Sequence, residues 1–430
     1  MILPLTRTPV RAEEFTTYKG HGGPIMALDV SPDGRLASAS FDNSVGLWPG
    51  PVWLEGHDAA VTALDASQAP AVLSGGDDFR VLLLHPELET PLEITKHKGK
   101  IGGIAVDATS DRIASASWDG SIQLHYVVKF LATNDMPVPL DFRTFELLGH
   151  RSNVTSVGFA PNGTLYSASS DGTIRVWEGP ETGTTSRVLV KHGFGINEIV
   201  VTEDWTAYGA VDGATRVIDH DGQQIADFTL DRRPILAMDY HADTGQLAVG
   251  DGHGYIMMID TAAWKITRDF RAMRKGPVWA LAFSNDGAII HVGGIDDVIY
   301  AWPVALLDQY DPAGGDARSF LRDAASMPNG ERQFMRKCSI CHALEPGPSR
   351  KAGPTLHAVF GRRAGTVPGY RYSAILDGSE IVWDETTIDA LFDIGPDHYI
   401  PGSKMPMQVI AKPSDRADLV AFLKTATKGD

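Results

Sequence analysis

The sequence lacks several features that would point to common functions. No stretch approaches the roughly 20 apolar residues of a membrane-spanning helix. No basic stripe offsets the formal net charge of −16, which argues against nucleic acid as a partner. Only two of the 430 residues are cysteines. A hydrophobic content of 43% and a charged content of 21% are typical of a globular protein, and the length predicts two or more domains.

Both cysteines fall in one short phrase, "KCSICHAL", where His342 directly follows Cys341 and Cys338 stands three residues before it. A structural zinc site would need two further ligands, and no second pair with suitable spacing exists. A redox dithiol usually lies at a strand-to-helix turn, which the surrounding sequence does not predict. The third alternative is covalent haem, held by two thioethers and an adjacent imidazole. The pentapeptide favours haem and leaves the other two chemistries open.

A phrase repeats through residues 1–305 at intervals of 36 to 52 residues. Four copies are strong, such as "LASASFDNSVGLW" (36–48) and "LYSASSDGTIRVW" (165–177), and three later copies are weaker. The interval predicts four short strands per unit, joined by Asp-Gly or Asp-Asn turns. The repeated aspartate position is occupied in turn by Asp42, Asp78, Asp119, Asp171, Asp212, His253 and Asp296.

A histidine stands 20–22 residues before five of these positions, at His21, His57, His97, His150 and His192. The repeat resembles the WD-repeat family, which implies an all-β propeller of seven blades. The resemblance also implies a hydrogen-bonded tetrad of His, Ser, Asp and Trp within a blade, because buried polar groups need partners. The first and fourth units contain a full tetrad: His21, Ser38, Asp42 and Trp48, and His150, Ser167, Asp171 and Trp177.

Three further features of the repeat region lead to separate expectations. The segment "EEFTTYKGH" near the start is expected to supply the outer strand of the last blade and so remove an exposed sheet edge. The insertion at 127–146 is expected to lengthen a loop on one face. His220, His241 and His291 lie outside the tetrad pattern and are read as structural or exposed.

After a polar linker, predicted at 306–322, the sequence changes character. Residues 323–430 resemble the class I cytochromes c, an all-α family of electron carriers, through phrases such as "GERQFMRKCSICHAL", "GPTLHAVFGRRAGTVPGYRYS" and "YIPGSKMPM". The resemblance implies one covalently attached haem c, with Cys338 and Cys341 as thioether anchors, His342 as the proximal iron ligand and Met405 as the distal one. Met407 is assigned to the core instead.

The resemblance also implies a set of residues around the haem. Pro354 matches the residue whose carbonyl accepts the ring N–H of His342. The positions expected to bind the haem propionates are Arg362, Tyr372, Trp383 and Ser403. The terminal helices are expected to cross where Gly330 meets Phe422, and the last helix is expected to begin with a Ser414 cap.

Some positions depart from the family pattern. Phe392 and Leu376 replace polar residues that many relatives place beside the haem, and both replacements remove polarity there. Asp397 and His398 replace lysines of the partner-docking face. Residues 323–430 contain 13 lysines and arginines and 13 aspartates and glutamates, so the net charge of −16 lies on residues 1–322.

Three functions are compared. The sequence favours a monohaem one-electron carrier without substrate turnover, in which the propeller docks a redox partner such as a dehydrogenase, an oxidase or another cytochrome. The alternatives are an oxidoreductase with a second site in the propeller, and a redox-responsive interaction scaffold. No convergent catalytic set supports the second. The apolar run at the start of the sequence, in "MILPLTRTPVRAEE", is too short for a signal peptide. Because haem c is normally attached outside the cytoplasm, we expect a removed or omitted leader and a periplasmic location.

Overall fold

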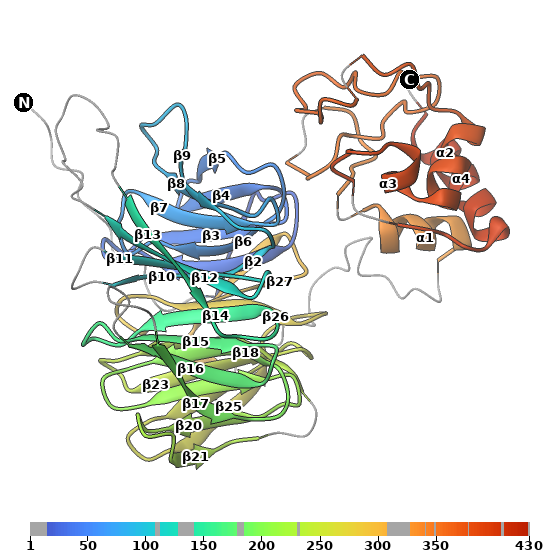
Figure 1. Ribbon diagram of the computed structural model, residues 1–430. Helices are drawn as coiled ribbons and strands as arrows, with labels where there is room; N and C mark the ends of the chain where they lie inside the picture. The colour runs from blue at the N-terminus through green and yellow to red at the C-terminus, as the bar shows by residue number, and fades with distance from the viewer. Residues whose placement is uncertain are drawn as a thin grey trace, which may run out of the picture.

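The computed structural model describes most of the chain, and it forms a β-propeller followed by a small helical region (Figure 1). The ranges described are 15–107, 112–127, 142–178, 185–229, 233–307, 327–339, 341–347, 350–376, 378–405 and 408–428. Among these residues, no helix is long and apolar enough to cross a membrane.

The propeller consists of seven antiparallel sheets of four strands, which confirms the predicted fold class. Blade one contains β2 (Ile25–Val30), β3 (Leu36–Ser40), β4 (Ser44–Trp48) and β5 (Val52–Glu55). Blade two contains β6 (Val61–Asp65), β7 (Val72–Gly76), β8 (Arg80–Leu84) and β9 (Leu92–Lys96). Blade three contains β10 (Ile101–Asp107), β11 (Arg112–Ser117), β12 (Ser121–Val127) and β13 (Phe142–Leu148). Blades four and five contain β14 (Val154–Phe159), β15 (Leu165–Ser169), β16 (Thr173–Glu178), β17 (Thr185–Lys191); and β18 (Ile196–Val201), β19 (Thr206–Ala210), β20 (Thr215–Ile218), β21 (Gln224–Asp227).

Blade six contains β22 (Ile235–His241), β23 (Gln246–Asp251), β24 (Tyr255–Asp260) and β25 (Lys265–Arg271), and blade seven contains β26 (Val278–Phe283), β27 (Ile289–Gly294) and β28 (Val298–Pro303). The fourth strand of blade seven is β1 (Thr16–Lys19), which pairs antiparallel with β28 in the register Thr16 with Ala301. The expected closure of the ring by the N-terminal segment is therefore confirmed. Closure pairs the edge of β28 that would otherwise be exposed.

The tetrads form as the repeat predicts. In blade one, the His21 ring lies 2.9 Å from Asp42 Oδ2 through Nδ1 and 2.8 Å from Ser38 Oγ through Nε2, and Trp48 Nε1 donates to the same hydroxyl at 2.8 Å. Blade four has the same contacts, with distances of 3.1, 2.8 and 2.8 Å. These buried groups satisfy one another and hold the strands of each blade in register.

Blade six departs from the pattern. His253 stands at the position of the tetrad aspartate, but Asp251, two residues earlier, accepts the backbone N–H of His253 at 2.8 Å. The Asp251 carboxylate also forms an ion pair with Arg233 at 2.9 Å. An ion pair therefore takes the structural place of the missing tetrad in this blade.

The insertion at 127–146 is shorter than predicted. Residues 142–146 belong to β13, where Glu146 pairs with Gln123 of β12, so the expectation of a loop over the whole range is wrong at its end. Phe145 and Leu147 alternate with the polar residues Thr144 and Glu146, a pattern typical of a strand, which explains the difference. Residues 128–141 lie outside the described residues.

The helical region contains α1 (Asn329–Lys337), α2 (Glu385–Ile394), α3 (Pro396–Tyr399) and α4 (Pro413–Ala426). At the crossing of α1 and α4, a β-carbon on Gly330 would stand 2.1 Å from the Asp418 carbonyl oxygen, so only glycine permits this approach. Phe334 packs against Phe422 nearby, with ring centroids 5.5 Å apart. The predicted contact between Gly330 and the Phe422 region is therefore present.

The start of α4 differs from the prediction. The helix begins at Pro413, and the preceding Lys412 makes no side-chain cap, so Ser414 lies inside the first turn and is not the cap. Proline is well suited to the first helical position because it has no N–H to leave unpaired. Between the propeller and the helices, a 3-10 turn spans Val304–Leu306, and residues 308–326 lie outside the described residues. The domain limits at 305 and 323 remain predictions.

Candidate functional site

The end of α1 places the two cysteines and the histidine around one turn of chain. The Cys338 N–H donates to the Phe334 carbonyl at 2.8 Å, as in a helix. The N–H groups of Cys341 and His342 then both donate to the Cys338 carbonyl, at 3.0 and 2.8 Å. Cys338 is buried and Cys341 is half-buried. This turn brings both sulfur atoms and the imidazole to one cavity.

The imidazole of His342 is oriented by its neighbours. Its Nδ1 lies 2.7 Å from the Pro354 carbonyl oxygen, so Nδ1 carries the proton and donates, and Nε2 keeps a free lone pair. Burial lowers the pKa of His342, which favours the neutral ring. A neutral imidazole with an available Nε2 is the form that binds a metal.

The environment of the cysteines does not favour the alternatives left open by the sequence. Burial raises the pKa of Cys338 to about 12 and that of Cys341 to about 11. A dithiol oxidoreductase requires the opposite shift, because its thiolate is the nucleophile. In the described part of the chain, no group of three or more His, Cys, Asp or Glu residues could hold a metal ion, so a zinc site finds no support there.

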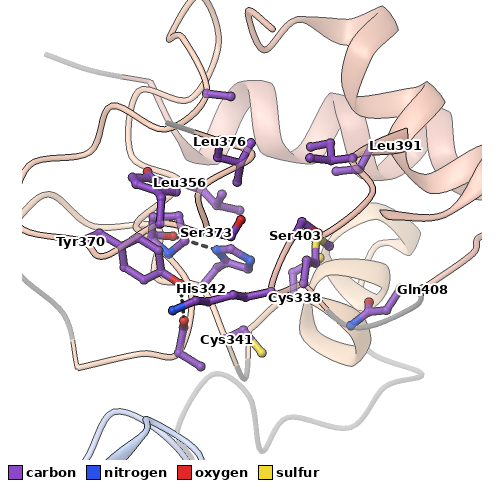
Figure 2. Close-up of a pocket in the computed structure, with 18 of the residues that line it drawn as sticks. Cys338, Cys341, His342, Leu356, Tyr370, Ser373, Leu376, Leu391, Ser403 and Gln408 are labelled. Atoms are coloured by element: carbon purple, nitrogen blue, oxygen red, sulfur yellow. Dashed lines mark hydrogen bonds between the residues drawn. The ribbon is translucent and has the colours of Figure 1, made fainter. Parts of the chain in front are cut away.

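The three residues line a cavity of about 530 Å³ (Figure 2). All nine predicted cofactor-binding residues line this cavity: Cys338, Cys341, His342, Pro354, Arg362, Tyr372, Trp383, Ser403 and Met405. Leu376 and Phe392 also line it, so the departures from the family pattern lie where the sequence placed them. Met407 lies outside the described residues.

Two of the expected propionate-binding residues already have protein partners. The Arg362 guanidinium donates to the carbonyl oxygens of His357 at 2.6 Å and Thr355 at 2.7 Å. The Tyr372 hydroxyl accepts the Val367 N–H at 3.2 Å, and its own proton remains available as a donor. Both side chains therefore hold backbone segments of the cavity wall in place through these hydrogen bonds.

The sequence did not identify several lining residues. Gly353 is one of them: a β-carbon there would stand 2.4 Å from Cε1 of His342. Ser373 and Gln408 are others, and their side-chain oxygens, like Ser403 Oγ, are buried without a hydrogen-bond partner among the described residues. In the sequence, only the phrase "AGPT" could have pointed to the close approach of Gly353 to the ring. No sequence pattern marked Ser373 or Gln408 as cavity residues.

These unpartnered oxygens test whether the residues fit a haem. Buried hydroxyl and amide groups normally have partners, so three at one cavity indicate a polar group that binds there. The remaining wall is largely apolar, with Leu356, Ile388 and Leu391 among its members. A flat apolar ring with carboxylate groups matches both properties. His342 Nε2 and the Met405 thioether would hold the iron, and the residues present fit the group.

Comparisons with known proteins agree with the two-part organisation. The WD domain, G-beta repeat model matches residues 12–49, 89–125, 142–178 and 264–303, and the Cytochrome c model matches 328–427. Cytochrome c of Sesamum indicum is 46% identical over 101 residues, which are 23% of this chain and 88% of that protein. Cytochrome c of Chlamydomonas reinhardtii is 40% identical over 104 residues, 24% of this chain and 92% of that protein.

The propeller resembles a solved structure in its fold. The crystal structure of the WD40 beta propeller domain of Doa1 matches with a TM-score of 0.56 and 17% identity, over 66% of this chain and 94% of that one. At this identity the likeness concerns the fold alone.

The comparisons correct one prediction. The periplasmic location was inferred from the haem motif alone, and it is wrong because the matched cytochromes c belong to plants and algae, such as Nigella damascena and Ulva intestinalis. The cofactor prediction is confirmed, because the relatives imply a covalently attached haem c. Through residues 328–427 the chain belongs to the cytochrome c family, and this domain follows a seven-bladed propeller with WD40 repeats.

Proposed function

We propose that the protein is a one-electron carrier whose propeller serves as a docking platform for a redox partner. The observation that supports the carrier most strongly is the single cavity lined by Cys338, Cys341, His342 and Met405. Bound there, haem supplies one-electron chemistry between Fe(II) and Fe(III), and ligation by histidine and methionine raises its potential.

The residues of the cavity perform three tasks. Pro354 holds His342 in the tautomer that presents Nε2, through the 2.7 Å hydrogen bond. Met405 offers a soft, neutral thioether on the same cavity. Leu376 and Phe392 present apolar surface to the cavity and exclude water from it. If His342 and Met405 both held the iron, no coordination position would remain for a substrate, which favours a carrier over an enzyme.

The charge distribution supports the docking role. Residues 1–322 carry the whole net charge of −16, whereas residues 323–430 are neutral. A partner that is steered by charge therefore meets the field of the propeller first. The partner classes that this role requires are a dehydrogenase, an oxidase or another cytochrome.

Two measurements test the proposal on the full chain. Potentiometric titration of the haem should give a reversible transition of one electron, and irreversible turnover of a substrate would contradict the carrier. Cross-linking to each candidate redox protein, followed by mass spectrometry, should place the links on the propeller. If every link fell within residues 328–427 while the rate of electron transfer with the partner stayed unchanged, the docking platform would be contradicted.

A further inference from the structure

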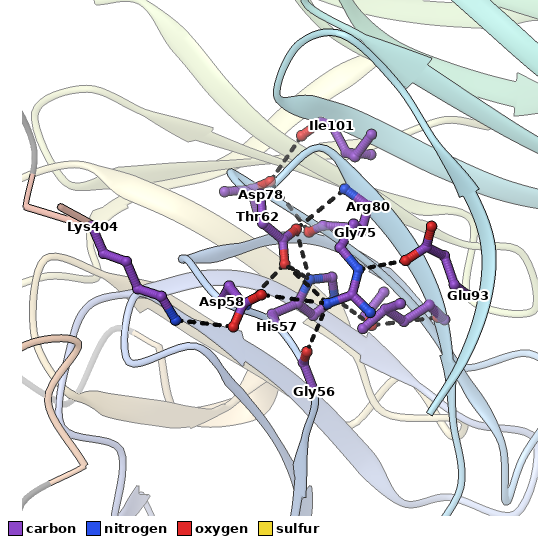
Figure 3. A network of polar contacts seen from close by, with 12 residues as sticks. Gly56, His57, Asp58, Thr62, Gly75, Asp78, Arg80, Glu93, Ile101 and Lys404 are labelled. Carbon is purple, nitrogen blue, oxygen red and sulfur yellow. Dashed lines mark hydrogen bonds and ion pairs between the residues drawn. The ribbon is translucent and has the colours of Figure 1, made fainter. Parts of the chain in front are cut away.

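Four cations of the cytochrome domain contact the propeller. Lys404 Nζ donates to Asp58 Oδ1 at 3.0 Å (Figure 3), and Arg371 forms an ion pair with the same carboxylate. Burial acts to raise the pKa of Asp58, but Lys404 and Arg371 outweigh it and hold that pKa below its ordinary value. One propeller carboxylate thus binds two cations from the segments that flank the cavity.

The other two cations lie side by side on the neighbouring blade. Arg350 pairs with Glu55 at 3.2 Å, and its guanidinium lies 4.0 Å from the centroid of the Trp53 ring, within the range of a cation–π contact. Lys351 Nζ donates to the Gly22 carbonyl oxygen at 3.0 Å. Gly22 also permits close backbone contact, since a β-carbon there would stand 2.4 Å from the carbonyl carbon of Arg350.

The propeller presents these contacts from rigid positions. In blades one to four, the residue after the repeat histidine donates its N–H to the repeat aspartate, at 2.8 Å for Gly22, 2.9 Å for Asp58, 2.8 Å for Lys98 and 2.9 Å for Arg151. In blade two, Asp58 also lies 3.8 Å from Arg80, which is fixed by Glu93 at 2.7 Å (Figure 3). Blades three and four carry the cations Lys98 and Arg151 at the equivalent position, which would repel Arg371 and Lys404. Blades one and two instead present Glu55 and Asp58 to the cations of the cytochrome domain.

The cavity that holds the cysteines and His342 continues to this face. Its lining includes propeller residues from the loops of blades one to three: Phe41, Asn43, Asp58, Ala59, Ala60, Asp77, Phe79, Lys100 and Trp118. Phe79 and Trp118 are 38% and 48% exposed, so the propeller core does not require them. Lys100 Nζ lies 4.8 Å from the centroid of the Trp118 ring, within the range of a cation–π contact.

We propose that the face formed by blades one to three is a binding surface for the chain's own cytochrome domain, and that it forms the outer wall of the haem cavity. The interface uses the cations Arg350, Lys351, Arg371 and Lys404, which an external partner would otherwise meet. The propeller therefore shields this side of the haem, and a partner gains direct access only when the ion pairs separate. The shielding rests on the haem site proposed above, whereas the docking of the two domains does not.

The first test uses the full-length haem protein and the charge reversal Asp58→Lys. Small-angle scattering should show a larger radius of gyration than the wild type at low salt, and the wild type should expand when salt screens the ion pairs. Asp243→Lys is the matched control: it makes the same change in charge at an exposed turn of blade six and should scatter as the wild type. An Asp58→Lys protein as compact as the wild type at every salt concentration would overturn the docking.

The second test uses a substitution at the interface that changes no charge. Gly22→Val places a wedge against the backbone of Arg350, while the N–H to Asp42 is retained. Arg151→Val, at the equivalent position of blade four, is the control for valine after a tetrad histidine. Gly22→Val should increase the radius of gyration of the protein. A neutral dihydroquinone should also reduce its ferric haem about threefold to tenfold faster than that of the wild type. This factor corresponds to the loss of one or two partly exposed ion pairs.

The two readouts separate the two parts of the proposal. Melting temperatures and haem absorption spectra of all four variants should match those of the wild type, which shows that both domains remain folded. Expansion without faster haem reduction would overturn the shielding. Faster reduction in Arg151→Val as well would show that the effect does not come from this interface.

Discussion

Gly353 lies directly against the imidazole of His342: a β-carbon at residue 353 would stand 2.4 Å from Cε1 and 2.8 Å from Nδ1. The next residue, Pro354, provides the carbonyl that accepts the Nδ1 proton. The close approach and the hydrogen bond therefore depend on the same two residues. Together they hold the ring in the orientation and tautomer that the cavity requires.

This relationship predicts the effect of Gly353→Ala. The added methyl group must displace the imidazole or the backbone, and overpacking of this kind costs about 1–3 kcal/mol of folding free energy. We expect a lower yield of haem-loaded protein and an altered ferric absorption spectrum. Gly330→Ala is the control: its β-carbon meets the Asp418 carbonyl at the helix crossing, away from the ring. It should lower the melting temperature and leave the ligand spectrum unchanged.

The second prediction concerns the sixth ligand. Met405 lines the cavity with His342, so Met405→Ala should abolish the weak sulfur-to-iron band at the red end of the ferric spectrum. The iron should then bind added ligands such as imidazole. Met407→Ala should leave the band in place. Loss of the band in Met407→Ala, with retention in Met405→Ala, would show that the register of the "PGSKMPM" phrase has been misassigned.

The third prediction concerns the tetrad of blade four. Burial acts to raise the pKa of Asp171, but hydrogen bonds from Thr173, the Arg151 N–H and His150 outweigh it and lower that pKa to about 2. Because the folded pKa lies below the ordinary value of about 3.8, the stabilisation is present above pH 4 and is lost as the pH falls toward 2.

Asp171→Asn should therefore reduce the free energy of unfolding at pH 7 by about 1–2 kcal/mol, a figure discounted for partial exposure. The difference from the wild type should shrink between pH 4 and pH 3 in urea titrations. Asp243→Asn, at an exposed turn, should show neither effect. A deficit that stays constant down to pH 3 would mean that the charge of Asp171 does not stabilise the blade.

The extent to which the sequence predicts the molecule differs between its parts. The seven blades are predicted because the Asp turn recurs in six units and a histidine precedes it in five of them, and the tetrad of His21 and Asp42 forms as expected. The spacing of Cys338, Cys341 and His342 within one turn favours haem, whereas Met405 is assigned through the resemblance to class I cytochromes c. The contact of Asp58 with Lys404 is not predictable, since the residues lie 346 positions apart and each alone is an ordinary surface charge. Ser373 and Gln408 were missed for the same reason: only the folded cavity shows that their oxygens lack partners.

The last prediction concerns acid stability of the strand pairs that close the ring. His291 of β27 is buried, its ring lies 5.9 Å from that of Tyr18 on β1, and burial lowers its pKa to about 4. Its Nδ1 has no hydrogen-bond partner among the described residues. A histidine with a folded pKa below its ordinary 6.5 binds a proton more tightly when unfolded, so stability is lost as the pH falls from 6.5 toward 4.

His291→Phe should remove this loss of stability at acid pH, because phenylalanine fills a similar volume and does not titrate. As the pH falls, the free energy of unfolding of the variant should exceed that of the wild type by a growing margin, up to about 3 kcal/mol near pH 4. Above pH 7 the pH should have little effect on the difference. Urea unfolding of the full chain between pH 4.5 and 7.5 measures the difference. His241→Phe, at a partly exposed site on β22, should not flatten the profile. Parallel profiles for the wild type and His291→Phe would mean that His291 binds a proton equally tightly in the folded and unfolded states, so that its burial does not penalise the charged ring.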